Sequence, residues 1–158
     1  MTITTAAEVG QTVPAQTLLD DTGAPVNLRE LAGKRVVLYF YPKDDTSGCT
    51  TQACAIRDTW SEFEAVEDLV IYGVSPDDVA SHTKFRGKHD LPFHLLVDTD
   101  HQLADDFGFW VEKSLYGNKY MGVERSTVII GADGNISAVA RKIAPGKHVA
   151  WLKSELGI

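Results

Sequence analysis

The two cysteines of this chain, Cys49 and Cys54, stand five positions apart where a predicted strand gives way to a predicted helix. The strand is the apolar run 36–40, and the helix is predicted from Thr50 to about Ala65. The first amides of a helix have no internal partner and, together with the helix dipole, favour an anion at that end. We therefore expect Cys49 to be held as a thiolate, which is the nucleophilic form of a thiol.

Neighbouring residues suit a reactive thiol at this turn. Thr46 places a hydroxyl three positions before Cys49, and Pro42 breaks the strand where the chain leaves the sheet. Taken alone, Thr46 could also be a simple helix cap, and the two cysteines could form a structural disulfide. On an intact helix, however, a spacing of five puts the two Cα atoms about 8–9 Å apart. A disulfide needs about 4.4–6.8 Å, so a bond between Cys49 and Cys54 requires the helix to unwind locally.

These residues carry a resemblance to a known family. Pro42, Thr46 and Cys49 match the Pro-x-x-x-Thr-x-x-Cys motif of the peroxiredoxins, and Cys54 is similar to the resolving cysteine of their bacterioferritin-comigratory (Q-type) branch. Segments 110–113, 120–125 and 126–130 also resemble that branch, so the likeness runs from about Val9 to Leu156. Many relatives have proline where this chain has Ser47. Serine would leave the turn freer and offer a further possible cap.

The resemblance implies a thiol-dependent peroxidase that reduces hydrogen peroxide and organic hydroperoxides. Cys49 would become a sulfenic acid and then condense with Cys54 to an intramolecular disulfide. Thioredoxin or a similar dithiol would reduce that disulfide. No metal, haem or flavin is implied as a cofactor, because the sulfur carries both electrons.

The same resemblance assigns the other site residues. Arg125 and Thr46 would position the peroxide and stabilise the leaving oxygen, and Pro42 and Gly48 would complete the substrate pocket. A guanidinium offers a fixed fork of N–H groups that can face sulfur and oxygen together, which lysine cannot do. The expectation that Arg125 lies near Cys49 comes from the resemblance. Spacing alone leaves Arg125 open as a surface ion-pair residue.

Two other classes of protein remain as alternatives. A thioredoxin-like disulfide carrier would normally use Cys-x-x-Cys, which this sequence lacks. A non-enzymatic metal chaperone would need both thiols and a histidine, but the histidines form no H-x-x-x-H pair, and a metal site is not predicted. We expect each histidine to be a surface or packing residue; they are His82, His89, His94, His101 and His148. The stretch 43–45 is expected to be a solvated turn.

Composition favours one ordinary globular domain over residues 1–158. Hydrophobic residues make up 44% and charged residues 23% of the 17.3 kDa chain. A net charge of −7 argues against binding to nucleic acids or anionic membranes. The stretch Met1–Ala7 lacks the features of a signal peptide, and no run approaches the roughly 18 apolar residues of a membrane span. We predict a cytoplasmic enzyme, and a monomer, because a resolving thiol in the same chain removes the chemical need for a dimer.

Strands alternate with helices along the chain, which predicts an α/β fold with a mixed sheet. The resemblance specifies a thioredoxin-like fold, with a central mixed β-sheet flanked by helices and an N-terminal β-hairpin extension. Residues 109–122 are predicted to be loop-like. Four aromatic side chains could line the mouth of the site or pack beneath a loop: Phe40, Phe107, Trp110 and Tyr120. The remaining predicted strands are 16–19, 26–28, 69–74, 93–97, 128–130 and 136–139. The remaining predicted helices are one that follows Asp78 and runs to about Lys88, 102–107 and 147–156.

Overall fold

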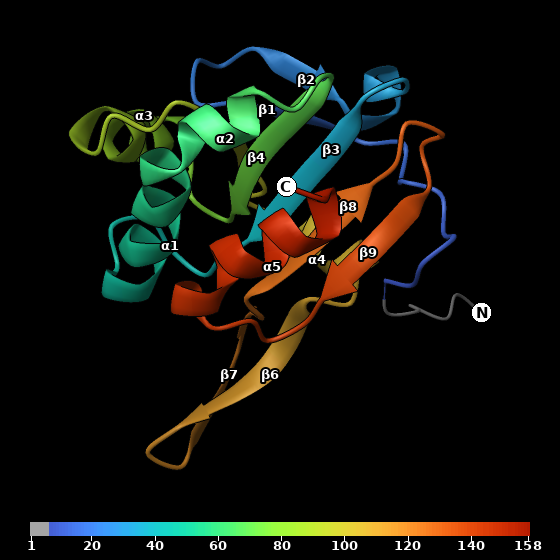
Figure 1. Cartoon of the computed structure of the whole chain (residues 1–158). Coiled ribbons are helices and arrows are strands. Elements are labelled where there is room, and N and C mark those ends of the chain that lie inside the picture. Colours follow the sequence, from blue (N-terminus) through green and yellow to red (C-terminus); the bar gives the residue numbers. More distant parts are fainter. Residues whose placement is uncertain (1–6) are drawn as a thin grey trace.

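A five-stranded mixed sheet forms the centre of the computed structural model, which describes residues 7–158 (Figure 1). The strand order is β5-β4-β3-β8-β9. β3 pairs parallel with β4 and antiparallel with β8, so the sheet is mixed, as predicted. The strands are β3 (Arg35–Phe40), β4 (Leu69–Ser75), β5 (His94–Val97), β8 (Ser126–Ile130) and β9 (Ile136–Ala140). The prediction that Met1–Ala7 is not a signal peptide concerns a stretch of which the structure describes only Ala7.

Strand β3 is covered on both faces, as its uninterrupted apolar run predicts. Val36, Leu38 and Phe40 face one core cluster, and Val37 and Tyr39 face the other. All five are at most 2% exposed. Because β3 occupies the middle of the sheet, the turn that follows it begins from a firmly held end.

Helices cover the two faces unequally. The face of Val37 and Tyr39 packs against buried side chains of α1 (Ser47–Asp58), α2 (Trp60–Glu64), α3 (Val79–Lys88) and α5 (His148–Leu156). The opposite face packs against α4 (Gln102–Asp106) and the N-terminal segment. Figure 1 shows α1 and α5 together on one side of the sheet, where they contact each other. Among residues 7–158, none of the helices has the length and apolar character needed to span a membrane.

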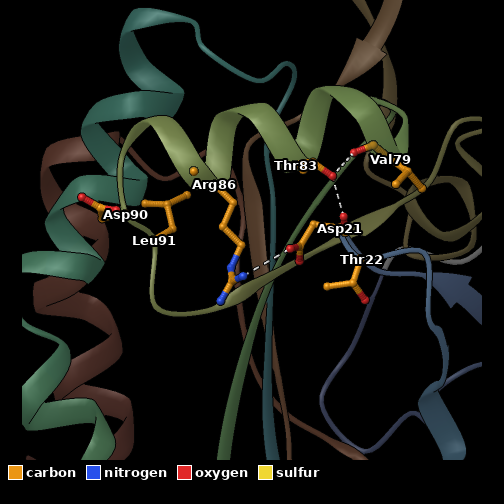
Figure 2. A pocket seen from close by; sticks show the side chains of 8 residues that line it. Asp21, Thr22, Val79, Thr83, Arg86, Asp90 and Leu91 are labelled. Atoms are coloured by element: carbon orange, nitrogen blue, oxygen red, sulfur yellow. Dashed lines mark hydrogen bonds and ion pairs between the residues drawn. The ribbon is translucent and has the colours of Figure 1, made fainter.

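The N-terminal extension is the predicted hairpin of β1 (Thr17–Leu19) and β2 (Pro25–Asn27), followed by the 3₁₀ helix η1 (Leu28–Leu31). Its turn is tied to α3 beside the cavity in Figure 2. There Arg86 Nη1 lies 3.5 Å from Asp21 Oδ2, and Thr83 Oγ1 lies 2.6 Å from the Asp21 carbonyl oxygen. These contacts attach the N-terminal extension to α3.

The prediction of a loop over residues 109–122 is wrong. The segment forms an antiparallel hairpin of β6 (Trp110–Leu115) and β7 (Asn118–Val123), which projects from the body in Figure 1. Tyr116 and Gly117 form its two-residue turn, with φ of 50° and 81°. The hairpin has little buried surface, because β6 has no buried side chain and four of the six side chains of β7 are exposed. It therefore lacks the apolar alternation from which a strand is predicted.

The helix predicted over residues 50–65 is two helices. α1 begins at Ser47, three residues earlier than predicted, and ends at Asp58 before α2 starts at Trp60. Thr59 separates them, and its hydroxyl donates back to the carbonyl of Ala55. The backbone leaves the helical conformation at Thr59, with φ of −107° and ψ of 13°, and the Thr59 amide bonds to the Ile56 carbonyl, three residues back. The apolar spacing does not reveal this break.

Candidate active site

Cys49 is the third residue of α1, and its side chain is only 1% exposed. The first α-helical bond at this end joins the Thr50 amide to the Thr46 carbonyl oxygen at 2.8 Å. The amides of Gly48 and Cys49 precede that bond and so have no partner within the helix. The sulfur therefore lies at the positive end of a twelve-residue helix, an environment that favours the thiolate.

Arg125 faces this sulfur. Its Nη2 donates to Cys49 Sγ at 3.3 Å, and its Nη1 donates to Gln52 Oε1 at 2.7 Å. Arg125 directly precedes β8, whose first residue, Ser126, pairs with Phe40 at the end of β3. The start of β8 and the exit of β3 lie at the same edge of the sheet for that reason. This register brings together two residues that are 76 positions apart.

Gly48 leaves room for the guanidinium. A Cβ atom at this position would lie 3.1 Å from Arg125 Nη2 and 3.4 Å from Pro145 Cγ. The first distance is shorter than ordinary van der Waals contact. Gly48 thus belongs to the site through the space that it leaves free, in addition to its backbone amide.

Thr46 is the N-cap residue of α1, but its side chain makes no capping hydrogen bond, so the simple-cap alternative is wrong. Its Oγ1 instead donates to the Lys43 carbonyl oxygen at 2.9 Å, which leaves the oxygen lone pairs of this exposed side chain free to accept. Ser47 is the first helical residue and does not occupy the cap position that the sequence suggested. Pro42 is half-buried and lies between β3 and this turn.

Cys54 lies on the same helix as Cys49 and is partly exposed. Both residues are free thiols, and α1 is continuous through them. Five residues of unbroken helix hold their Cα atoms about 8–9 Å apart. The structure therefore has the thiol form, in which the two sulfurs are separated by helix geometry.

Two buried residues of the site, Gln52 and His148, are not predicted from the sequence. Gln52 Nε2 lies 3.0 Å from His148 Nδ1, and His148 Nε2 lies 2.8 Å from Thr127 Oγ1. Burial, and then the charge of Arg125, lower the pKa of His148 to about 3, so the ring is neutral. Gln52 could have been found from its position one helical turn after Cys49. His148 lies 96 positions from Gln52 and gives no such signal.

The turn before α1 is anchored by a carboxylate that we expected to be solvated. Asp44 is only 6% exposed and accepts from Tyr41 Oη at 2.5 Å and Ser81 Oγ at 2.8 Å. His82 Nδ1 lies 2.7 Å from Asp44 Oδ2, and His82 Nε2 lies 2.8 Å from the Leu96 carbonyl oxygen. Burial disfavours a charged imidazole, but the hydrogen bond and charge of Asp44 outweigh it and raise the pKa of His82.

This cluster also contains Asp77, and one possible metal ligand from each of Asp44, Asp77 and His82 lies within 4.8 Å of the others. Both ring nitrogens of His82 already face oxygen acceptors, and Asp77 Oδ2 accepts from the Asp44 amide at 2.8 Å and from Ser75 Oγ. The chemistry of the cluster is thus that of an internal ion pair, which fixes the turn onto α3.

A groove of about 660 Å³ opens beside Arg125, between the β6–β7 hairpin and the segment after β9. Val111, Tyr120 and Ile143 contribute apolar surface to it, and Lys113 lines it as well. Burial and the charge of Arg125 lower the pKa of Lys113. Of the other aromatic residues considered for the mouth of the site, Phe40 and Phe107 are core residues, and Trp110 stacks on His101 with 3.8 Å between ring centroids.

Known proteins resemble this chain in sequence and in fold. Residues 9–139 match the model of the AhpC/TSA family. The chain belongs to this family. It is 49% identical to the peroxiredoxin Bcp of Bacillus subtilis, over 90% of each chain. It is also 47% identical to a putative peroxiredoxin of Coxiella burnetii, over 94% of this chain and 98% of that one.

Solved structures of peroxiredoxins are similar to it over nearly their whole length. A Xanthomonas campestris bacterioferritin comigratory protein superimposes with a TM-score of 0.87 at 33% identity, covering 95% of this chain and 98% of that one. Peroxidoxin BcpB of Mycobacterium tuberculosis gives 0.83 at 33% identity, covering 96% and 97%. The predicted thioredoxin-like fold and the predicted bacterioferritin-comigratory branch are confirmed. This peroxiredoxin is a thiol-dependent peroxidase.

Proposed function

We propose that Cys49 is the peroxidatic nucleophile and Cys54 the resolving thiol of a peroxidase that thioredoxin or a similar dithiol recycles. The observation that carries this proposal is the Arg125 guanidinium, 3.3 Å from a buried sulfur at the start of a helix. The thiolate of Cys49 attacks one peroxide oxygen, and the O–O bond breaks. Sulfur gains that oxygen as a sulfenic acid, and the other oxygen leaves as an alkoxide or hydroxide that takes a proton from water.

The remaining site residues have separate roles in this step. Negative charge develops on the leaving oxygen, and preorganised donors aimed at it lower the barrier. Arg125 and the amides of Gly48 and Cys49 would be those donors. Thr46 would accept a hydrogen bond from the peroxide, because its own proton is committed to the Lys43 carbonyl. Pro42 would shield the pocket from water.

In the second step, the Cys54 thiol attacks the sulfur of the Cys49 sulfenic acid and expels water. The continuous helix α1 must unwind around these residues for the two sulfurs to meet, since a disulfide needs Cα atoms within about 6.8 Å. The dithiol then reduces the disulfide and returns both thiols. We expect the disulfide form to lack the first turns of α1, and an intact first turn in that form would contradict this step.

The groove beside Arg125 supports organic hydroperoxides as substrates in addition to hydrogen peroxide. Its apolar side chains, Val111, Tyr120 and Ile143, would contact an alkyl group while the peroxide faces Cys49. The similar Xanthomonas campestris protein has been described for its alkyl peroxide reduction activity. We further propose that the chain works as a single-domain monomer in the cytoplasm, where reductants keep thiols reduced.

The test is peroxide consumption coupled to thioredoxin and its reductase, measured for the parent, Cys49→Ser and Cys54→Ser. Cys49→Ser should have no activity. Cys54→Ser should lose turnover with thioredoxin. Its Cys49 should still be oxidised by peroxide, and a small thiol should reduce it again. Unchanged consumption by Cys49→Ser would refute the assignment. Insulin reduction without peroxide consumption would identify a disulfide carrier, and metal uptake in equilibrium dialysis would identify a metal chaperone.

A further inference from the structure

We propose that His148 is a positioning residue for peroxide reduction, acting through Gln52 on the Arg125 guanidinium that faces Cys49. The inference rests on the proposed function, because it assigns a role within the same site. Its basis is a continuous chain of side chains: Thr127, His148, Gln52 and Arg125 are joined by contacts of 2.8, 3.0 and 2.7 Å. Gln52, His148 and Thr127 are all fully buried, so water cannot replace any partner.

The direction of each hydrogen bond in this chain is fixed by chemistry. Arginine only donates, so the group that Gln52 presents to Arg125 must be its carbonyl oxygen. The amide nitrogen of Gln52 then points to His148 Nδ1, which must accept. His148 therefore carries its proton on Nε2, where it donates to Thr127 Oγ1. A neutral imidazole with this tautomer holds the Gln52 amide in the one orientation that presents oxygen to Arg125.

The surroundings of His148 keep the ring in this form. It is buried on α5, and the aromatic ring of Tyr39 on β3 lies 5.4 Å away between centroids. The positive group near it is Arg125, which disfavours a second positive charge. A proton on Nδ1 would face the N–H₂ of Gln52. The amide would then have to turn over and present hydrogens to the guanidinium.

Gln52 lies between Cys49 and Cys54, so its hydrogen bond to His148 also affects the unwinding of α1. Unwinding of this part of α1 must break both the Gln52–His148 and the Gln52–Arg125 hydrogen bonds. His148 therefore supports the helical form that attacks peroxide and opposes the unwound form that makes the disulfide. Loss of the contact should slow the first step and accelerate the second, a pair of opposite effects that a purely structural residue would not produce.

Two conservative variants separate the ring nitrogens. In His148→Asn, the amide oxygen can occupy the place of Nδ1 and accept from Gln52. In His148→Gln, the longer side chain reaches the place of Nε2 and leaves Gln52 without its acceptor. By stopped-flow kinetics, we expect His148→Gln to lower the rate constant of sulfenic acid formation about tenfold, the effect of one hydrogen bond of about 1.4 kcal/mol. His148→Asn should stay within about threefold of the parent.

A further readout follows from the same variants. His148→Gln should form the disulfide severalfold faster than the parent after oxidation. Equal kinetics of the two variants in both steps, or slower disulfide formation in His148→Gln, would overturn the proposal. In a Gln52→Leu background the two His148 substitutions should behave alike, since the residue that transmits their difference is gone.

A measurement on the unmodified protein covers the case in which a variant does not fold. Long-range ¹H–¹⁵N NMR of the His148 ring at pH 7 should show a proton on Nε2 and none on Nδ1, and a proton on Nδ1 would refute the inference. The outcomes are distinguishable from those of the proposed function. A parent protein without peroxidase activity refutes the proposed function, whereas an active parent matched in every step by His148→Gln refutes only the role of His148.

Discussion

The guanidinium of Arg125 lies over Gly48, with Nη2 only 3.1 Å from the point where a side chain at Gly48 would begin. No side chain with a Cβ atom fits there unless the Arg125 guanidinium moves. Gly48, which lies within the Pro-x-x-x-Thr-x-x-Cys motif, is therefore in direct contact with Arg125, the residue that precedes β8.

Gly48→Ala should therefore weaken catalysis with little loss of stability. The added methyl group requires Nη2 to shift by a few tenths of an ångström, which should weaken its hydrogen bond to Cys49. A hydrogen bond to a charged group is worth about 1.5–3 kcal/mol, so losing part of it should slow sulfenic acid formation severalfold. Stopped-flow kinetics with hydrogen peroxide measure that rate. Gly87→Ala is a matched control, because Gly87 also lies in a helix and has open space around it. Equal rates for Gly48→Ala and the parent would show that the guanidinium tolerates displacement.

Arg125→Lys should lower the same rate about 100-fold, the typical effect of removing a preorganised donor. An ammonium cannot contact Cys49 Sγ and Gln52 Oε1 together, as the two ends of the guanidinium do. Arg57→Lys, at a partly exposed position on α1, is the control for the chemical change itself. If lysine at position 125 sustained the full rate, positive charge alone would be sufficient and the fork geometry would be irrelevant.

Ser47→Pro tests the departure from the usual motif. Ser47 is the first residue of α1, where proline is well tolerated and fixes a helical φ. Proline should stabilise the folded protein by about 0.4–1 kcal/mol, chiefly by restricting the unfolded chain. It should also slow disulfide formation severalfold, because the unwound segment gains less freedom. Thermal unfolding and single-turnover disulfide formation measure the two effects, and a faster disulfide step would contradict this explanation.

The buried histidines predict opposite pH dependences of stability. His148 has a lowered pKa of about 3, so between that value and about 6.5 the unfolded chain binds more protons and stability falls as the pH falls. From pH 7 to 5 this costs about 2 kcal/mol. His82 has a raised pKa, so its stabilising effect is complete below about 6.5 and is lost as the pH rises through the raised value.

Denaturant unfolding at several pH values, with His148→Asn as the non-titrating variant, measures the first effect. The free energy of unfolding of the parent should drop by about 2 kcal/mol more than that of the variant between pH 7 and 5. Parallel curves for the two proteins would mean that His148 titrates equally in the folded and unfolded states.

Asp44→Asn should destabilise the protein by about 3 kcal/mol, because it leaves a buried imidazolium without its counter-ion. Asp45→Asn is the matched control one residue away. Asp45 is exposed and pairs with Lys88 at the surface, where ion pairs contribute little. Similar losses for both variants, measured by chemical denaturation, would mean that the pairing of Asp44 with His82 is no more important than a surface contact.

Much of the fold could be predicted from the sequence, because buried strands such as β3 and β4 are continuous apolar runs. The β6–β7 hairpin could not be predicted in this way. Its side chains are mostly exposed, and its tight turn depends on two residues with positive φ, one of them Tyr116. The break at Thr59 is a local change of backbone conformation, with φ of −107° and ψ of 13°, which periodicity does not report.

For the site, the motif residues were predicted from their resemblance to a family motif, but the residues that support them were not. Asp44 looks like part of a polar turn, and only the packing of α3 against that turn makes it a buried ion-pair partner. His148 is one of five histidines with no distinguishing neighbours in the sequence. Its contact with Gln52 exists because α5 lies against α1, a tertiary relationship that local pattern does not encode.

The two ends of α1 are held differently from its middle. Before it, Asp44 and Asp45 are tethered to α3 through His82 and Lys88, and after it, Thr59 separates it from α2. If α1 unwinds around the two thiols as proposed, we expect the anchored turn before it and the break at Thr59 to confine the change to this helix. The sheet and the other helices would then keep their positions through each catalytic cycle.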